Sequence, residues 1–245
     1  MKFPLEDKTI LITGGTSGIG LELVKQLHAK NQVLVLGRNN EKLSSLESAY
    51  PGTKTFRADL AKPNSLKLPA EHITEQFPAI DLLINNAAVQ HTAMFADAEF
   101  QSAHIADEIA VNFTSPALLI ALLLPALLKN TPSAILNVNS GLGIVPKKTS
   151  AIYCGTKGGL DIFSQSLRNQ LEHTNIHVLQ AFMPLVDTPM TEGRGSGKIS
   201  ASDAALRMIK GTEKLKPIND IGNVKILRFL SRIAPPLARS LMKKR

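Results

Sequence analysis

Five short runs of aliphatic residues recur along the chain. Their positions are 9–12, 33–36, 82–84, 134–138 and 176–179. The runs are nearly continuous rather than alternating, which is typical of strands that are buried on both faces of a sheet. Between them lie longer segments in which apolar residues recur at helical spacing, at 18–30, 40–49, 69–77, 101–130 and 151–173.

This alternation of strand and helix predicts an α/β fold, a three-layer doubly wound parallel sheet in a single domain. The glycine-rich segment 192–198 is too short for a domain linker, and we expect it to form a mobile loop. We therefore assign residues 1–215 to the main body of the domain and residues 216–245 to a C-terminal extension of the same domain.

Composition narrows the class of protein. The single cysteine, Cys154, excludes an intrachain disulfide, and 4% aromatic residues without tryptophan argue against a base-stacking surface. No apolar leader precedes the first strand, so we expect a cytoplasmic protein. The longest aliphatic stretch, 117–128, is too short for a membrane span and suits a buried helix. The six histidines lack the spacing of metal ligands, so we expect no metal site.

Charge is concentrated in the C-terminal extension. Residues 216–245 carry eight basic side chains and one acidic side chain, a net +7, so the rest of the chain holds only +1 of the total +8. This distribution argues against a nucleic-acid-binding protein. On a helical wheel one side of the extension is apolar, with Ile226, Leu230, Ile233, Leu237 and Leu241. The other side is basic, with Arg228, Arg232, Arg239 and Lys243.

Two interpretations of this amphipathic extension stay open. The apolar side packs on the domain or on a partner subunit, with the charges in solvent, or the extension makes weak contact with an anionic membrane surface. We favour packing, because any surface helix shows such a stripe. Pro235 and Pro236 should divide the extension into two helices.

A glycine-rich turn links the first strand to the first helix. Its spacing is G-x-x-x-G-x-G, from Gly14 through Gly18 to Gly20. Glycine permits the sharp turn and a close approach of the backbone to a pyrophosphate, and the helix N-terminus offers unpaired N–H groups. We therefore predict a dinucleotide site, and its first segment comprises Gly14, Thr16, Ser17, Gly18, Ile19 and Gly20.

The residue after the second strand bears on which dinucleotide binds. NAD enzymes usually place a carboxylate there for the ribose 2′-hydroxyl. This chain has Arg38 and no carboxylate in that segment, and a guanidinium suits a 2′-phosphate. We therefore predict NADP(H) rather than NAD(H).

Tyr153 and Lys157 supply a phenol and an ammonium at positions i and i+4 of a predicted helix, and so on one face. A cation beside a tyrosine stabilises the phenolate and lowers its pKa, which suits proton transfer near neutral pH. Ser140 follows the strand at 134–138, and Asn112 lies in the helix that precedes that strand.

Together these motifs resemble the short-chain dehydrogenase/reductase family over residues 7–190. The resemblance implies a Rossmann fold with seven strands, and a catalytic set of Asn112, Ser140, Tyr153 and Lys157. Tyr153 would act as general acid in reduction and as general base in oxidation. Lys157 would lower the pKa of Tyr153 and hold the nicotinamide ribose. Ser140 would donate a hydrogen bond to the substrate oxygen, and Asn112 would support a water that links Lys157 to solvent.

The family pattern extends the cofactor site to residues that follow later strands. These are Asp59, Leu60, Asn86, Ala87, Ala88, Pro184, Val186 and Thr188. Three positions depart from the family pattern: Ala88 and Leu185 replace glycines, and Ser17 replaces a basic residue found in many NADP-binding members, which weakens the NADP(H) prediction. Within the family the chain is similar to the oxidoreductases encoded with lipoteichoic-acid D-alanylation genes, on the strength of residues 184–188 and the extension.

The resemblance also suggests a substrate pocket and an assembly. We expect the pocket to include His91, Met94, Leu142, Ile144, Leu185 and Met190, with Phe95, Val145 and Val186 nearby. These side chains are mostly apolar, so we predict an apolar carbonyl or secondary-alcohol substrate. A homodimer or homotetramer is expected through the helix at 117–124 and the helix that carries Gly158 and Gly159. The alternatives are a catalytically silent NADP(H)-binding sensor or scaffold, and a membrane-surface protein that acts through its extension.

Overall fold

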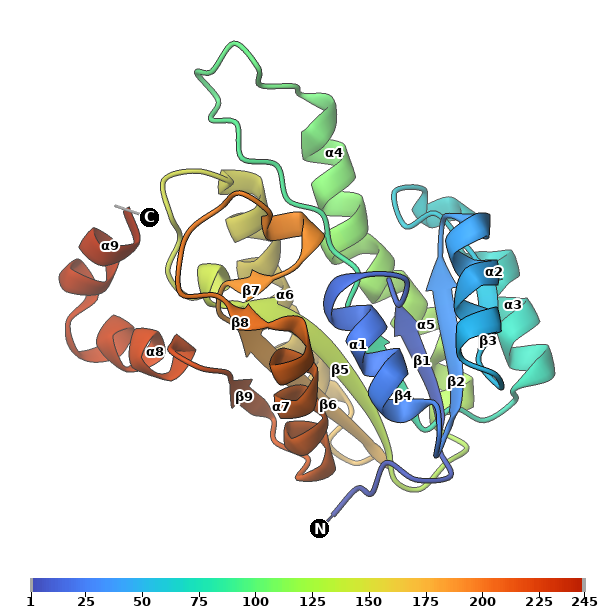
Figure 1. Ribbon diagram of the computed structural model, residues 1–245. Coiled ribbons are helices and arrows are strands. Elements are labelled where there is room, and N and C mark those ends of the chain that lie inside the picture. The colour runs from blue at the N-terminus through green and yellow to red at the C-terminus, as the bar shows by residue number, and fades with distance from the viewer. Residues whose placement is uncertain (1, 244–245) are drawn as a thin grey trace.

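Seven parallel strands form the central sheet of the computed structural model, which describes residues 2–243 (Figure 1). They are β1 (Thr9–Thr13), β2 (Gln32–Gly37), β3 (Lys54–Arg57), β4 (Leu82–Asn85), β5 (Ser133–Ser140), β6 (Ile176–Met183) and β9 (Ile218–Asp220). Their order across the sheet is β3-β2-β1-β4-β5-β6-β9. The direction of winding therefore reverses between β1 and β4, where doubly wound sheets bind ligands. A second, two-stranded sheet pairs β7 (Val186–Asp187) with β8 (Ile199–Ser200).

Both faces of the sheet are buried, which explains the continuous aliphatic runs. In β1, Ile10 and Ile12 contribute to one core and Leu11 contributes to the other. The first core is covered by α1 (Gly18–Leu27), α2 (Asn40–Ala49) and α7 (Ala201–Glu213). The second core is covered by α3 (Lys67–Gln76), α5 (Ser115–Leu127) and α6 (Ala151–Gln170). The predicted three-layer α/β fold is confirmed.

Short helical turns complete the connections between these elements. They are η1 (Pro63–Ser65), η3 (Gly141–Gly143) and η4 (Pro189–Thr191).

One long helix runs from α4 (Ala103–Ile109) through the π-helical turn η2 (Ala110–Thr114) into α5. Among the described residues this is the one helix long and apolar enough to cross a membrane, by length and composition alone. The 12-residue aliphatic stretch considered from the sequence is thus part of a longer helix. Leu119, Leu123 and Leu127 of that helix are fully buried in the second core, so it serves here as a core helix.

The first part of the C-terminal extension belongs to the central sheet. Residue 215 lies before β9, which pairs with β6, so the expected boundary at 215 would cut off the last strand of the sheet. Two helices follow, α8 (Val224–Ile233) and α9 (Pro235–Lys243), divided at the predicted prolines. They pack beside the loop that follows β5, where Ala238 and Met242 contact Val145.

Of the four basic side chains predicted to lie in solvent, Arg232, Arg239 and Lys243 are exposed and Arg228 is not. Arg228 does not point into solvent, because its guanidinium forms a bidentate ion pair with Asp220, at 2.7 and 2.8 Å, and lies 4.2 Å from the ring centroid of Phe182. Lys244 and Arg245, which were counted in the basic extension, lie outside the described residues.

Candidate active site

A cleft of about 860 Å³ runs along the carboxyl ends of the strands. The connections leave β1 and β4 toward opposite faces of the sheet, because the strand order reverses between them. One space is therefore bordered by the glycine turn, the loop after β4 and the N-terminal part of α6. Most of the predicted site residues line it. They are Gly14, Thr16, Ser17, Gly18, Ile19, Arg38, Asp59, Leu60, Asn86, Ala87, Ala88, Ser140, Leu142, Tyr153, Lys157, Pro184, Leu185, Val186, Thr188 and Met190.

The glycine turn has the geometry that a pyrophosphate site needs. Gly14 and Gly18 have φ values of +70° and +53°, which side chains rarely adopt. Ser17 precedes α1 and makes no side-chain capping bond, so the N–H groups of the first turn of α1 are left for a ligand. This chain therefore fits a dinucleotide at the predicted place.

Gly20 was predicted to be part of the cofactor-binding surface, but it does not line the cleft. A Cβ atom at this position would lie 2.2 Å from the carbonyl oxygen of Gly14 and 2.6 Å from Nδ2 of Asn86. Glycine is required there so that α1 can pack under the turn, which is a structural role behind the binding surface.

Asn86 and Thr13 tie the end of β4 to the glycine turn. Nδ2 of Asn86 donates to the carbonyl oxygen of Thr13 at 3.0 Å, and the backbone N–H groups of Asn86 and Ala87 both donate to Oγ1 of Thr13 at 3.0 Å. These bonds cross more than 70 residues of sequence, so they hold the two halves of the sheet in register at the switch point.

Arg38, Asp59 and Leu60, for which the sequence predicts contact with the adenosine part of a cofactor, all line the cleft. Arg38 is exposed at the end of β2, and no hydrogen bond or ion pair to its guanidinium is found among the described residues. Oδ1 of Asp59 accepts a hydrogen bond from the backbone of Ala61 at 3.1 Å, which fixes the carboxylate in its own loop. A free guanidinium thus stands where the sequence predicted one.

Tyr153, Lys157 and Ser140 also line the cleft and are all buried, with exposed fractions of 9%, 3% and 8%. Nζ of Lys157 donates to the carbonyl oxygen of Val138 at 2.8 Å and lies 5.7 Å from the centroid of the Tyr153 ring. Oγ of Ser140 accepts from the backbone of Leu142 at 3.1 Å. β5 therefore positions both Ser140 and, through Val138, the ammonium on α6.

Burial is the main cause of the pKa shifts of Tyr153 and Lys157. Loss of hydration raises the pKa of Tyr153 to about 12, although the hydrogen bond with Ser140 lowers it. Burial likewise lowers the pKa of Lys157 to about 8. The net change in the Tyr153 pKa is thus opposite to the predicted lowering by Lys157, because in this arrangement desolvation outweighs the favourable contacts of the phenol.

Asn112 does not line the cleft, although it was predicted as catalytic. It is fully buried in the π-helical turn η2, and its side-chain amide forms two 2.9 Å hydrogen bonds with the backbone of Val89. Nδ2 also lies 3.3 Å from Oγ1 of Thr156, the neighbour of Lys157. Asn112 therefore positions the loop after β4 against α6.

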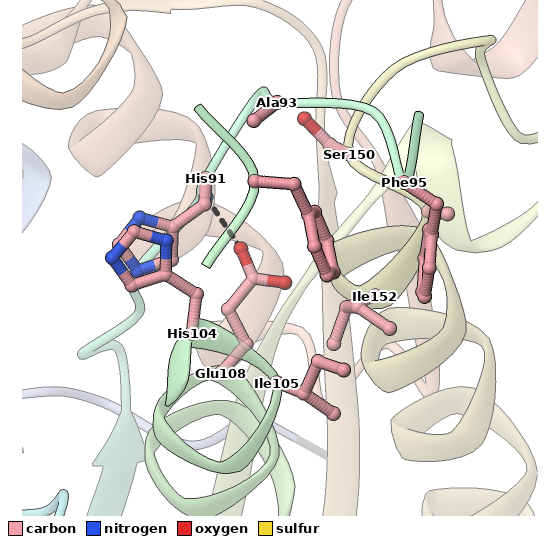
Figure 2. Close-up of a pocket in the computed structure, with 10 residues that line it drawn as sticks. His91, Ala93, Phe95, His104, Ile105, Glu108, Ser150 and Ile152 are labelled. Atoms are coloured by element: carbon pink, nitrogen blue, oxygen red, sulfur yellow. Dashed lines mark hydrogen bonds between the residues drawn. The ribbon is translucent and has the colours of Figure 1, made fainter. Parts of the chain in front are cut away.

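Several residues predicted for the substrate pocket lie elsewhere. His91 stacks on His104 in a small side pocket, with ring centroids 3.6 Å apart, and its backbone N–H donates to the buried carboxylate of Glu108 (Figure 2). Burial raises the pKa of that carboxylate. Phe95 lines the same side pocket. Met94, Ile144 and Val145 are also absent from the lining of the main cleft. In the case of Val145, the reason is that α9 covers it.

Other residues of the cleft were not found from the sequence. Nη1 of Arg194 donates to Oε1 of Gln90 at 2.9 Å, and Nη2 donates to the carbonyl oxygen of Met190, so the glycine-rich loop is fastened across the cleft. Lys147 lines the same end. The glycine-rich composition of 192–198 was the one signal available, and it indicated mobility rather than a contact.

The C-terminal helices also contribute to the cleft. Their lining side chains are Val224, Ile226, Leu227, Leu230, Leu241 and Met242. No group of three or more metal-binding side chains occurs within residues 2–243.

Comparison with known proteins agrees with this geometry. The family model for short chain dehydrogenases matches residues 8–198. The chain is 35% identical over 189 residues to the uncharacterized oxidoreductase DltE of Bacillus subtilis, covering 77% of this chain and 75% of the relative. It is 30% identical over 196 residues to an uncharacterized oxidoreductase of Staphylococcus epidermidis, covering 79% and 84%.

Solved structures share the fold at lower identity. A short chain dehydrogenase from Burkholderia cenocepacia in complex with NADP has a TM-score of 0.88 at 20% identity and covers 98% of this chain and 99% of its own. A short chain dehydrogenase/reductase from Burkholderia phymatum in complex with NAD has a TM-score of 0.85 at 18% identity, with 97% of both chains covered. The matched segment includes both the glycine turn and the helix that carries Tyr153 and Lys157, and the chain therefore belongs to the short-chain dehydrogenase/reductase family of NAD(P)-dependent oxidoreductases.

Proposed function

We propose that this oxidoreductase uses NADP(H) to interconvert a carbonyl and a secondary alcohol on a substrate that is largely apolar. The supporting observation is that Tyr153 and Ser140 line the same cleft as the uncapped N-terminus of α1. A silent dinucleotide-binding protein has no need of a buried phenol and hydroxyl at that place.

The proposed mechanism assigns each protein group one task. A bound nicotinamide supplies or takes up the hydride. In reduction, Tyr153 donates its proton to the substrate oxygen, and the raised pKa of the phenol keeps that proton in place at neutral pH. Ser140 donates a hydrogen bond to the same oxygen as negative charge develops on it. Lys157 keeps a positive charge near the Tyr153 ring, which favours the tyrosinate left behind.

Arg38 carries the proposed preference for NADP(H). Its exposed guanidinium lines the cleft without a partner among the described residues, and bidentate pairing with a 2′-phosphate suits it.

The test is a fluorescence titration of the purified protein with NADPH and with NADH. Arg38→Ala should weaken NADPH binding by roughly tenfold to a hundredfold, the scale of one charged hydrogen-bonded contact, and leave NADH binding unchanged. Arg57→Ala, at the exposed end of β3 and outside the cleft, is the matched control. Equal affinity for the two cofactors, or an equal loss for both in Arg38→Ala, contradicts the NADP(H) assignment.

The side chains around the expected substrate position favour a carbonyl compound that is apolar over most of its length and carries an acidic group. Leu142, Leu185 and Met190 supply apolar surface, whereas Lys147 and Arg194 add positive charge. The two charges are close enough that Arg194 contributes, after burial, to lowering the pKa of Lys147. We therefore infer that an acidic group on an otherwise apolar ketone or aldehyde improves its turnover. A screen of paired substrates with and without a carboxylate tests this, and equal kcat/KM across the pairs would count against it.

We also propose that the protein is a homodimer and that it is located in the cytoplasm. Gly155, Gly159 and Ile162 recur at helical spacing on α6, and Ile162 is 67% exposed although it is apolar, which suits a helix-to-helix contact with a second copy. Light scattering on Ile162→Asp should then report a smaller particle than that of the unaltered protein.

A further inference from the structure

Exposed apolar side chains are concentrated on the two C-terminal helices. Ile226, Phe229 and Ile233 on α8 are 63%, 61% and 62% exposed, and Leu237 and Leu241 on α9 are 51% and 48% exposed. These five are among twelve large hydrophobic side chains that are exposed in residues 2–243, yet they fall within a segment of 16 residues. We call this group of five the α8–α9 surface. A patch of this kind on a soluble domain marks a contact surface.

The α8–α9 surface is exposed although its helices are firmly attached. Val224, Ala238 and Met242 are buried, and the ion pair between Arg228 and Asp220 fastens α8 to the end of β9. The helices lie at the edge of the molecule, beyond β9 (Figure 1). The inner side of each helix is thus already used, and the exposed apolar side chains are left for an external partner.

Positive charge lies along one side of the apolar stripe. At about 100° per residue, Ile226, Phe229 and Ile233 fall within an arc of roughly 60°, and Lys225 and Arg232 both lie next to it on the side of Phe229. Arg239 and Lys243 add two charges on α9. All four basic side chains are exposed, and no ion pair to any of them occurs in the described part of the chain. An apolar face combined with basic side chains on the remaining surface is typical of helices that lie in the interface of an anionic bilayer.

The charges decide between a lipid surface and a second copy of the chain. A symmetric contact between two α8–α9 surfaces would bring two sets of four unpaired cations together, which repel each other. An anionic bilayer instead neutralises the cations and accepts the apolar side chains. We propose that the α8–α9 surface docks the protein on a membrane that contains anionic lipid.

The docking surface also borders the cleft. Ile226 and Leu241 are exposed and, at the same time, line the cleft that contains Tyr153. A docked protein therefore presents the mouth of its cleft to the bilayer. This consequence rests on the proposed function: a lipid-like carbonyl compound would enter the cleft from the bilayer rather than from water.

Vesicle co-sedimentation of the full chain tests the docking. Vesicles of phosphatidylcholine that contain phosphatidylglycerol should retain the protein, and vesicles of phosphatidylcholine alone should retain much less. Lys225→Gln combined with Arg232→Gln should lower binding to the anionic vesicles by roughly 25-fold, at about fivefold per cation removed. Lys42→Gln combined with Lys129→Gln removes two exposed cations elsewhere and should have little effect.

A second variant separates the apolar contribution from the charge. Phe229→Ser combined with Ile233→Ser should release the protein from anionic vesicles and leave NADPH binding intact, because neither side chain lines the cleft. Equal binding to both vesicle types, or unchanged binding by both double variants, would overturn the proposal. Loss of dimers in light scattering without any loss of vesicle binding would also overturn it, since the surface would then be a subunit interface. Vesicle binding needs no turnover, so its outcome is independent of the NADPH titration that tests the proposed function.

Discussion

Lys157 carries a charge that the proposed reaction uses and that burial makes unfavourable, so its replacement tests both effects. Its side chain is only 3% exposed, and burial lowers its pKa from 10.5 to about 8. With this pKa Lys157 is still mainly an ammonium ion at pH 7, but burial makes its charge less favourable than in the unfolded chain. Replacement by methionine keeps an unbranched apolar stem of similar length and removes the charge.

The expected magnitude follows from the two pKa values. At 1.36 kcal/mol for each tenfold change, the difference between 10.5 and about 8 makes the buried charge cost about 3 kcal/mol of stability at pH 7. Because the folded pKa lies below the unfolded one, stability recovers as pH rises from about 8 to 10.5. At pH 10 the remaining cost is about 1 kcal/mol. Lys157→Met also leaves the carbonyl oxygen of Val138 without its donor, a penalty of about 1–3 kcal/mol that does not depend on pH.

Urea unfolding followed by circular dichroism measures this directly, since the chain has no tryptophan. Between pH 7 and pH 10, the free energy of unfolding of the wild type should rise by about 2 kcal/mol relative to that of Lys157→Met. The comparison cancels other groups that titrate in this range, such as Cys154, whose pKa burial raises.

Parallel pH profiles for the two proteins would refute the reasoning, because they would mean that Lys157 keeps its ordinary pKa in the folded state. The same variant should lose turnover, so that the buried charge is retained for the reaction at the expense of stability.

Three further outcomes are expected. Tyr153→Phe should fold, bind NADPH and lose turnover by about 10²–10⁴-fold in a carbonyl-reduction assay; wild-type turnover would remove the phenol from the mechanism. Gly20→Ala should lower the thermal midpoint strongly, because its Cβ would lie 2.2 Å from the carbonyl oxygen of Gly14, and an unchanged midpoint in calorimetry would contradict that packing role. Arg228→Met should loosen α8 and speed its amide hydrogen exchange, whereas exposed Lys225→Met should not; equal exchange in the two variants would argue against the ion pair as the anchor.

Local sequence patterns were sufficient for much of the site. Gly14 and Gly18 were identified because positive φ values and a helix N-terminus after a strand have a strong local signature. Tyr153 and Lys157 were identified because an i, i+4 pair shares a helix face wherever the helix lies. Gly20 was also noticed, but its role depends on the distance to the carbonyl oxygen of Gly14, which no spacing rule contains.

The differences from the sequence predictions come from tertiary contacts that helical or strand periodicity does not contain. His91 was expected in the substrate pocket, yet it stacks on His104, 13 positions along the chain, and its backbone N–H donates to Glu108 in a side pocket (Figure 2). Asn112 was predicted to support a water beside Lys157. Its side-chain amide holds the backbone of Val89, a contact that the sequence did not indicate, and its part in catalysis stays a prediction. Arg228 was placed in solvent by helical periodicity, although Asp220 pairs with it. Periodicity states which residues share a face but not what that face meets.

The amino-acid sequence alone thus indicates a doubly wound sheet, a glycine-rich dinucleotide turn and a tyrosine–lysine pair on one helix face. Each of these leaves a pattern within a short segment, because a strand buried on both faces is continuously apolar and helix geometry fixes which neighbours share a face. Tertiary structure decides which groups share the cleft, how far burial moves the pKa values of Tyr153 and Lys157, and that the C-terminal helices border the cleft. Desolvation and packing depend on atoms that come from every part of the chain at once, so only the assembled fold determines them.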